Sequence, residues 1–450
     1  MNANKKSIYR GFAFLLTLTT VLHFTNLTHP NCVVFDEVHF GEFSSAYCCD
    51  HNRIYDIHPP HAKILIAAMA KLGGYNGGFS FKNIQTPYNG NTLAFWMRVV
   101  PAIVGSLLPI SIAYLILLLG ASLQAALLGG LIVTLDNALL LQTRIIALDG
   151  VLLLSIVISL IFFLSAQRYQ DTSKRYIYLL LAGAFSGLAT GTKFTGLAAP
   201  FLICTGMLIE FSKDRNLSKF IYWLRQGVWV FFGFITVYLF GWYLHFLLLD
   251  KPGYADQFVK ITGNFFYDLF NLHVSMFNSN ANLTATHPDA SLFWKWLWMR
   301  KAIFYSQFNN STLYLIGNPV VWYGSTLGLA IILFQSLSDW IRGKKAMESK
   351  HIFWVPIVGY LISYLPLWRV TRALFLYHYM TPLLFAWLLI LLWADRRGWL
   401  KSEALKNQSV YYFCFIVILV VGFIIISPFT YSIEIGPDYR KFLISTFVGP

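Results

Sequence analysis

The chain has 450 residues, of which 57% are hydrophobic and only 12% are charged. A soluble domain carries about 25% charged residues, so this composition excludes a chain that faces water on all sides and predicts one that crosses a membrane several times. The net charge of +14 comes largely from bases in short connectors between apolar runs, a pattern that favours orientation in a membrane over nucleic-acid binding.

The first apolar segment follows Lys5, Lys6 and Arg10 and continues to about Leu22. It resembles a signal peptide, but no small-residue cleavage site follows it, so we expect an uncleaved first span. With about 20 apolar residues per span, we expect an all-α polytopic membrane protein, one domain over residues 1–450. Eleven spans are predicted near residues 9–27, 96–118, 120–141, 145–165, 176–191, 195–211, 224–249, 315–336, 352–368, 373–394 and 409–428.

The connectors between these spans differ in charge and in length. Four basic connectors would share the side of the N-terminus: 166–175, 213–225, 342–350 and 395–406. By the positive-inside rule this side is cytoplasmic. The opposite side then holds two long loops, 28–95 and 250–314, with most of the clustered acids and histidines. We therefore expect chemistry on the outer face, which is the periplasmic face if the protein lies in a bacterial inner membrane.

The first long loop carries the strongest chemical signal, the adjacent acids Asp36 and Glu37 between Phe35 and Phe40-Gly41. Apolar neighbours and mutual repulsion would raise the pKa of at least one carboxyl group, which suits a general base. Two solvated loop acids are the alternative interpretation.

The same loop contains further groups suited to acid–base chemistry: His39, His58, His61 and Lys63. Its apolar spacing predicts short interfacial helices over 35–47 and 59–72, the second beginning at a proline pair, which is a favourable helix start. Cys32 could pair with Cys48 or Cys49 if the loop faces an oxidising compartment. The sequence has no zinc-type cysteine spacing, and we predict neither a metal nor a cofactor.

Several charged residues lie at or inside the predicted spans. Arg98 begins the second span, where its guanidinium could bind a phosphate bidentately or simply extend to the interface. Arg144 and Asp149 lie in an apolar run, so they should face a cavity or pair with each other. A purely structural ion pair between them is the rival interpretation.

Two more cationic positions could bind phosphate. Lys193 follows Gly191-Thr192 at an outer helix end, and the alternative is again an interfacial lysine. Arg372, with Arg369 nearby, departs from the positive-inside trend and calls for an anionic partner, either a substrate or a lipid headgroup. His378 follows in the same segment.

Taken in order, these segments resemble the protein O-mannosyltransferase family, multi-span enzymes that use lipid-linked sugars. The matching blocks cover nearly the whole chain and are strong only in combination: Asp36-Glu37-Val38-His39-Phe40-Gly41, His58-Pro59-Pro60-His61-Ala62-Lys63, Asp136-Asn137-Ala138 through Gln142-Thr143-Arg144 to Asp149, Lys193-Phe194-Thr195-Gly196, Thr286-His287-Pro288 with Trp294-Lys295-Trp296, Leu315 to Trp322, and Phe375-Leu376-Tyr377-His378-Tyr379.

The resemblance implies a GT-C-type bundle whose first external loop carries the catalytic acid, and a polyprenyl-phosphate sugar donor, expected to be mannose. Carried over by motif, Asp36 is the expected base with Glu37 beside it, and Arg98 is a donor-phosphate ligand. Ala62 stands where the family usually has glycine. The loop 250–314 is too short for the β-trefoil domain of eukaryotic members, which favours a bacterial-type member.

The expected reaction transfers the sugar, with inversion, to an acceptor hydroxyl, taken as Ser or Thr of a protein. Arg98, Arg144, Lys193 and Arg372 are the candidate phosphate ligands, and the expected supporting residues are His39, His58, Lys63, Asp149 and His378. Two alternatives remain: the same chemistry on a lipid or envelope glycan, as in aminoarabinose transferases, and a transporter. A transporter is disfavoured because the sequence shows no internal repeat and its charges gather near one face.

Overall fold

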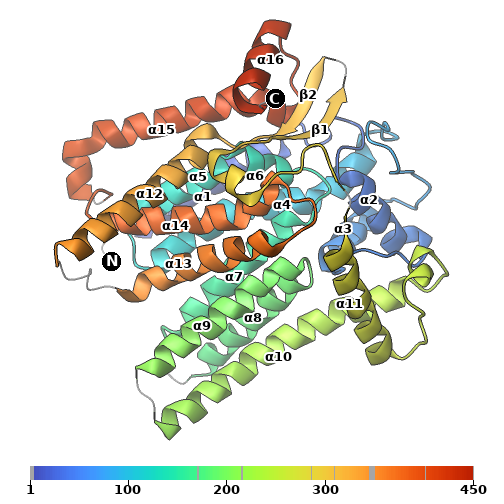
Figure 1. Cartoon of the computed structure of the whole chain (residues 1–450), viewed down its shortest axis with the longest axis horizontal. Helices are drawn as coiled ribbons and strands as arrows, with labels where there is room; N and C mark the ends of the chain where they lie inside the picture. The colour runs from blue at the N-terminus through green and yellow to red at the C-terminus, as the bar shows by residue number, and fades with distance from the viewer. Residues whose placement is uncertain are drawn as a thin grey trace.

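The computed structural model describes residues 5–169, 172–213, 216–284, 286–308, 310–343, 350–400 and 402–448. In these residues the chain forms a bundle of helices with one two-stranded sheet at an end (Figure 1). The bundle helices are α1 (Lys5–Phe24), α4 (Asn91–Leu118), α5 (Leu123–Thr134), α6 (Asn137–Gln142), α7 (Asp149–Ala166), α8 (Ser173–Thr190), α9 (Ala198–Ser212), α10 (Leu217–Leu248), α12 (Pro319–Ile341), α13 (Lys350–Tyr364), α14 (Met380–Arg396) and α15 (Ser402–Tyr431).

Each of the eleven predicted spans contains a helix, which confirms the all-α membrane fold. In the part of the chain that the structure describes, eight helical segments are long and apolar enough to cross a membrane. α5, α8 and α13 are not among them. The predicted span 120–141 is broken at Asp136, whose carboxylate accepts hydrogen bonds from the Leu139 amide at 2.9 Å and from Trp322 at 2.9 Å.

The helices divide into central and peripheral ones. In the most apolar 18-residue stretches of α4, α7 and α14, 67%, 72% and 72% of the residues are buried inside the protein. In those of α12 and α15 the buried share is only 17% and 22%. A helix that is apolar on all sides must be buried by protein or by lipid, so the outer faces of α12 and α15 are suited to lipid.

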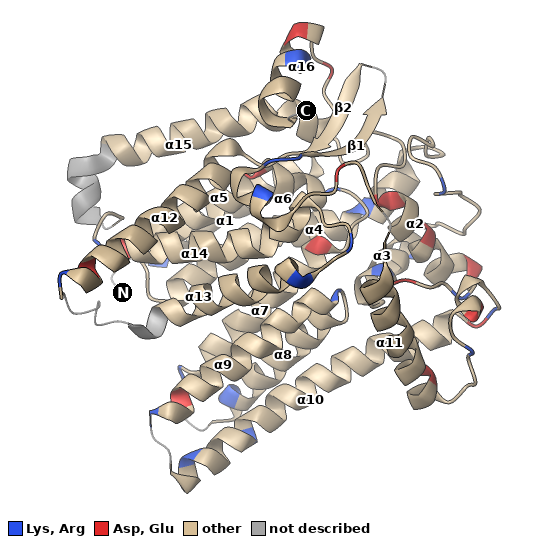
Figure 2. Ribbon diagram, viewed as in Figure 1, with Lys and Arg blue, Asp and Glu red and all other residues tan. Residues whose placement is uncertain are grey.

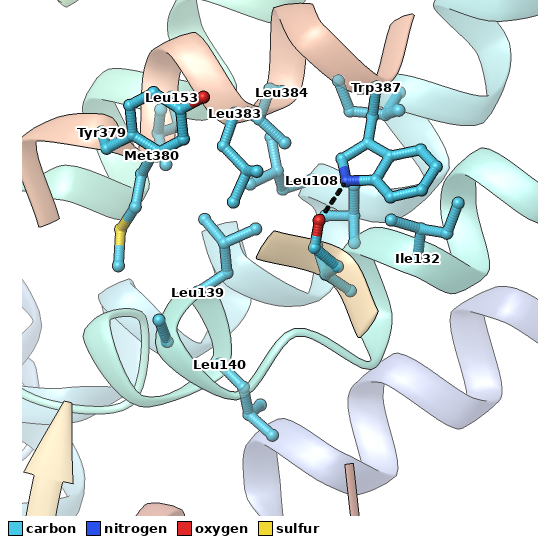
Figure 3. Packing of buried hydrophobic residues seen from close by; sticks show 14 of the residues in the cluster. Leu108, Ile132, Leu139, Leu140, Leu153, Tyr379, Met380, Leu383, Leu384 and Trp387 are labelled. Carbon is cyan, nitrogen blue, oxygen red and sulfur yellow. Dashed lines mark hydrogen bonds between the residues drawn. The ribbon is translucent and has the colours of Figure 1, made fainter. Parts of the chain in front are cut away.

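Apolar side chains from separate helices fill the centre of the bundle. Figure 3 shows Leu108 of α4, Ile132 of α5 and Leu139 of α6 against Leu383 and Trp387 of α14. The Trp387 indole donates to the Val321 carbonyl at 3.0 Å, so the buried indole N–H is satisfied.

Short elements gather at the end of the bundle away from the N-terminus, which we call the loop end (Figure 1). They are α2 (Glu37–Ser45), α3 (His61–Leu72), α11 (Phe265–Asn282), the antiparallel hairpin of β1 (Ile303–Phe308) and β2 (Ser311–Leu315), and α16 (Pro437–Leu443). Helices α2 and α3 confirm the two short helices predicted in the first long loop. The sequence did not predict α11 or the hairpin.

Charge is distributed unevenly along the bundle (Figure 2). Lysine and arginine outnumber the acids at the N-terminal end, as the sequence pattern indicated, although acids also mark α9 and α12 there, and acids and bases mix at the loop end. Residues 170–171, 214–215, 344–349 and 401 of those connectors lie outside the described residues.

The cysteines of the first long loop differ from the pairings that the sequence left open. The sulfur atoms of Cys48 and Cys49 are bonded to each other, and Cys32 is a buried free thiol. The suggested bond from Cys32 to either of them is therefore wrong, because the two candidate partners bind each other.

Candidate active site

The turn before Asp36 separates the two adjacent acids. Phe35 has a φ of +36°, a conformation rare for a bulky residue. Its amide donates to the Tyr305 carbonyl of β1 at 3.1 Å, and its ring stacks on Tyr305 with centroids 4.4 Å apart. The hairpin thus holds the chain in a turn from which Asp36 and Glu37 enter different surroundings.

Glu37 is fully buried and its carboxylate is saturated with hydrogen bonds. Arg98 donates to it through Nε at 2.8 Å and Nη2 at 2.9 Å, and the Tyr88 hydroxyl donates at 2.9 Å. The backbone amides of Val34 and Ile146 each add a bond of 3.0 Å. Glu37 is therefore a structural anchor with no lone pair turned toward a substrate.

Arg98 is equally saturated. Besides Glu37, its guanidinium donates to the carbonyls of Leu27, Pro30 and Cys32 at 3.3, 3.0 and 3.0 Å. All five N–H groups of the side chain are then occupied. The expected role of Arg98 as a phosphate ligand does not fit this geometry, because the buried guanidinium has no donor left to offer.

Arg144 also binds backbone rather than substrate. It donates to four carbonyls at the end of α1, those of Leu22, His23, Thr25 and Asn26, at 2.7, 2.6, 2.7 and 3.1 Å. A cation at a helix C-terminus satisfies the last carbonyls and complements the helix dipole. Arg144 is not paired with Asp149, which binds Lys193 instead. The expected role as a phosphate ligand does not fit a guanidinium that caps α1.

Asp149 and Lys193 form the ion pair of the site. The Lys193 Nζ lies 2.7 Å from the Asp149 carboxylate, to which Gln142 donates from the other side at 2.8 Å. The Tyr305 hydroxyl in turn donates to Gln142. This chain runs from α6 through α7 to the start of the 3₁₀ turn η2 (Phe194–Leu197), and it fixes the ammonium 5.3 Å from the Tyr377 ring.

Asp36 is half-buried, and in the described part of the chain its carboxylate has no hydrogen bond or ion pair. Burial raises the pKa of Asp36 to about 7, against the opposing field of Lys193 and with repulsion from Asp149 and Asp56. These charges therefore surround Asp36 without neutralising it. A carboxylate of this pKa can take up a proton near neutral pH.

A second ion pair lies beside this group. Lys63 of α3 donates to Asp56 at 2.5 Å and to the His58 carbonyl at 2.8 Å. Burial lowers the pKa of His58 to about 3, opposed by Asp56 and helped by Lys193 and Arg372, so the imidazole is neutral at pH 7. His58 therefore lies within electrostatic range of both ion pairs and of Arg372.

Arg372 lies between the 3₁₀ turns η5 (Leu365–Arg369) and η6 (Leu376–Tyr379). Its side chain is half-buried, and in the ranges that the structure describes it has neither a hydrogen bond nor an ion pair. Burial lowers its pKa, with Tyr377 and Asp56 opposing the shift. A cation that is partly removed from water and unpaired is suited to an anionic ligand.

The remaining predicted residues divide in the same way. His378 stacks on Tyr377 with centroids 4.6 Å apart and lies beside the site. His39 is exposed on α2, where its ring contacts Phe43. The structure thus brings together Asp36, His58, Lys63, Asp149, Lys193, Arg372 and His378, and it separates Glu37, Arg98, Arg144 and His39 from them.

Sequence reasoning missed Tyr305, Gln142 and Asp56 as members of the site. Gln142 belongs to a polar group inside an apolar span, which was the available signal. The sequence around Tyr305 gave no such signal, because Tyr305 reaches Gln142 only through the β1–β2 hairpin, which the sequence did not predict.

Two family models cover the chain. Residues 13–250 match "Dolichyl-phosphate-mannose-protein mannosyltransferase" and residues 265–442 match "C-terminal four TMM region of protein-O-mannosyltransferase". Among curated proteins, dolichyl-phosphate-mannose–protein mannosyltransferase 4 of Candida albicans is 34% identical over 261 residues, 54% of this chain and 34% of that protein. The chain spans about a third of the length of the curated relatives it matches.

Solved structures share the fold. The S. cerevisiae protein O-mannosyltransferase Pmt1-Pmt2 complex bound to the sugar donor aligns with a TM-score of 0.89 at 18% identity, over 99% of this chain and 92% of that chain. ArnT from Cupriavidus metallidurans bound to undecaprenyl phosphate aligns with a TM-score of 0.53 at 15% identity, over 99% and 77%. The family model over residues 13–250 covers more than half of the sequence. The chain belongs to the protein O-mannosyltransferase family.

Proposed function

We propose that the chain transfers a mannosyl group from a polyprenyl-phosphate donor to a serine or threonine hydroxyl of a protein. The single observation that carries this proposal is Asp36, a half-buried carboxylate with a pKa near 7 that has no hydrogen bond or ion pair in the described chain and lies in the field of Lys193. Family membership supplies the donor class, and the yeast Pmt1-Pmt2 complex of the same fold is bound to the sugar donor.

Asp36, Lys193 and Arg372 each have a separate role in the proposed transfer step. The acceptor oxygen bonds to the anomeric carbon while the bond from that carbon to the donor phosphate oxygen breaks, and the hydroxyl proton passes to Asp36. Attack from the side opposite the phosphate inverts the anomeric centre. Lys193 and Arg372 take up the charge that develops on the leaving phosphate. With two cations at the phosphate, no separate general acid is required.

The distribution of charge supports a site on the outer face of the membrane. The basic connectors lie at the N-terminal end, and α2, which follows Asp36 directly, lies at the loop end (Figure 2). By the positive-inside rule the loop end faces outward, which is the periplasm for a bacterial inner-membrane protein. The donor lipid would then lie in the bilayer with its headgroup at this outer face.

Purified protein in nanodiscs, given polyprenyl-phosphate mannose and a synthetic peptide containing Ser and Thr, should add one hexose mass to the peptide. Mass spectrometry of the product tests this, with a peptide in which every Ser and Thr is alanine as the matched control. A parallel incubation with envelope lipids and glycans tests the aminoarabinose-transferase-like alternative. A hexose found only on lipid or glycan would overturn the choice of protein as acceptor.

The pH dependence of transfer follows from the raised pKa of Asp36. Because that pKa is about 7 rather than 3.8, the base is protonated and inactive below pH 7 and ionised above it. We expect kcat/KM to rise with pH through about 7, falling by about tenfold per unit on the acid side. Initial rates from pH 5.5 to 8.5 measure this, and a flat profile down to pH 5.5 would contradict a base of this pKa.

A further inference from the structure

Helix α11 presents three different faces. Leu272 and Met276 are buried against the bundle, whereas Phe266, Phe270 and Phe277 are exposed on another side. A third stripe is polar, because positions three and four apart fall on one side of a helix: it consists of Asn271, Ser275, Asn278, Ser279 and Asn282. The exposed phenylalanines suit a lipid surface, which leaves the polar stripe toward water.

This polar stripe forms one wall of a groove of about 590 Å³, and residues of the segment from Phe258 to Thr262 line its other side. The side-chain amides of Asn271, Asn278 and Asn282 have no hydrogen bond to any residue that the structure describes. Among the described residues that line the groove the only charge is that of Lys260. The groove therefore offers neutral donors and acceptors, which suits a chain of peptide groups better than an anion.

The short segment from Tyr55 to Ile57 lies between this groove and the catalytic group. The Tyr55 hydroxyl hydrogen-bonds to Ser275 at 3.0 Å and to Ser279 at 2.7 Å, and Asn280 donates to the Ile57 carbonyl at 3.3 Å. Asp56, which lies between Tyr55 and Ile57 in the sequence, binds Lys63 at 2.5 Å. Tyr55 thus binds two serines of the polar stripe, whereas the next residue, Asp56, pairs with Lys63 of the catalytic group.

We propose that this groove on α11 is a binding subsite for the acceptor polypeptide, holding residues that flank the modified Ser or Thr in extended form. The inference rests on the proposed function. From Asn271 to Asn282 the stripe rises about 16 Å, at about 1.5 Å per residue. An extended peptide advances about 3.3 Å per residue, so the stripe spans about five acceptor residues. Each asparagine amide can donate to a peptide carbonyl and accept from a peptide N–H.

The double variant Asn271→Ala/Asn278→Ala tests the subsite. We expect KM for a 15-residue acceptor to rise about tenfold, because hydrogen bonds from two amides to the peptide are lost. The value of kcat, and KM for a three-residue acceptor too short to reach the groove, should stay unchanged. Asn83→Ala, at an exposed asparagine of the first long loop that does not line the groove, is the matched control and should leave both KM values unchanged.

A binding measurement separates failure of the subsite from failure of the proposed function. Fluorescence anisotropy of a labelled 15-residue Ser/Thr peptide, with protein in nanodiscs, should give a dissociation constant raised about tenfold in the double variant and unchanged in Asn83→Ala. Peptide binding that depends on the groove without hexose transfer would overturn the proposed function and keep the subsite. The subsite would be overturned if the double variant transferred hexose with an unchanged KM for the 15-residue peptide. It would also be overturned if the double variant and Asn83→Ala bound that peptide equally well. Binding of mannan oligosaccharide but not of peptide would also overturn it.

Discussion

Replacing Asp36 by asparagine should lower kcat for mannosyl transfer by about 10³-fold or more, since general-base catalysis contributes about 10²–10⁴-fold. The amide keeps the shape of the side chain but cannot accept the hydroxyl proton or balance positive charge at the anomeric carbon. Asp36→Ala should have the same effect. The measurement is hexose transfer to a Ser/Thr peptide by the purified variant.

The folding of the Asp36 variants should be intact, because the carboxylate has no hydrogen bond within the described chain and its burial is a cost at neutral pH. Membrane insertion and thermal unfolding in detergent check this. Glu42→Gln removes one acid from α2 in the same loop and should keep near-normal turnover. Turnover near that of the original protein in Asp36→Asn would exclude Asp36 from the chemistry.

Breaking the pair between Glu37 and Arg98 should have the largest effect on stability. Arg98→Met leaves the fully buried Glu37 carboxylate without its cation, and loss of one partner of a buried pair costs about 3–5 kcal/mol. The variant should unfold at lower temperature in detergent or fail to accumulate. Glu37→Gln should also be destabilised, because it leaves the buried Arg98 guanidinium without a negative charge to pair with.

The double variant Glu37→Gln/Arg98→Met distinguishes pairing from independent roles. It should be less destabilised than the sum of the single variants, because no unpaired charge remains buried. A folded Arg98→Met protein with normal thermal stability and a raised KM for the donor would instead indicate that Arg98 binds the phosphate.

The sequence predicted the bundle well, because each span is a long apolar run and its signal is local. It also singled out Asp36, Lys193 and Arg372, which the structure brings together at the loop end, since charge is costly in an apolar surrounding. Its errors concern partners. Arg98 and Arg144 were as conspicuous as Lys193, but local sequence cannot show whether a guanidinium meets substrate or backbone carbonyls, which come from segments brought together only by folding.

The elements at the loop end were missed for a different reason. Strands β1 and β2 carry five or six residues each beside an apolar span, so their period-two pattern was too short to stand out. Helix α11 mixes exposed aromatic, polar and buried residues, and three such faces give no single apolar stripe to recognise.

The stretch from Leu22 to Cys32, which leads to Asp36, is held in place through its backbone carbonyl groups. Arg144 and Arg98 bind carbonyl oxygens along it, atoms that every amino acid possesses. Relatives could therefore change many identities here without displacing Asp36, provided that the two arginines are retained. The path of this stretch can therefore be conserved even where its side chains are not. A segment whose sequence varies among relatives can be held as firmly as one whose sequence does not.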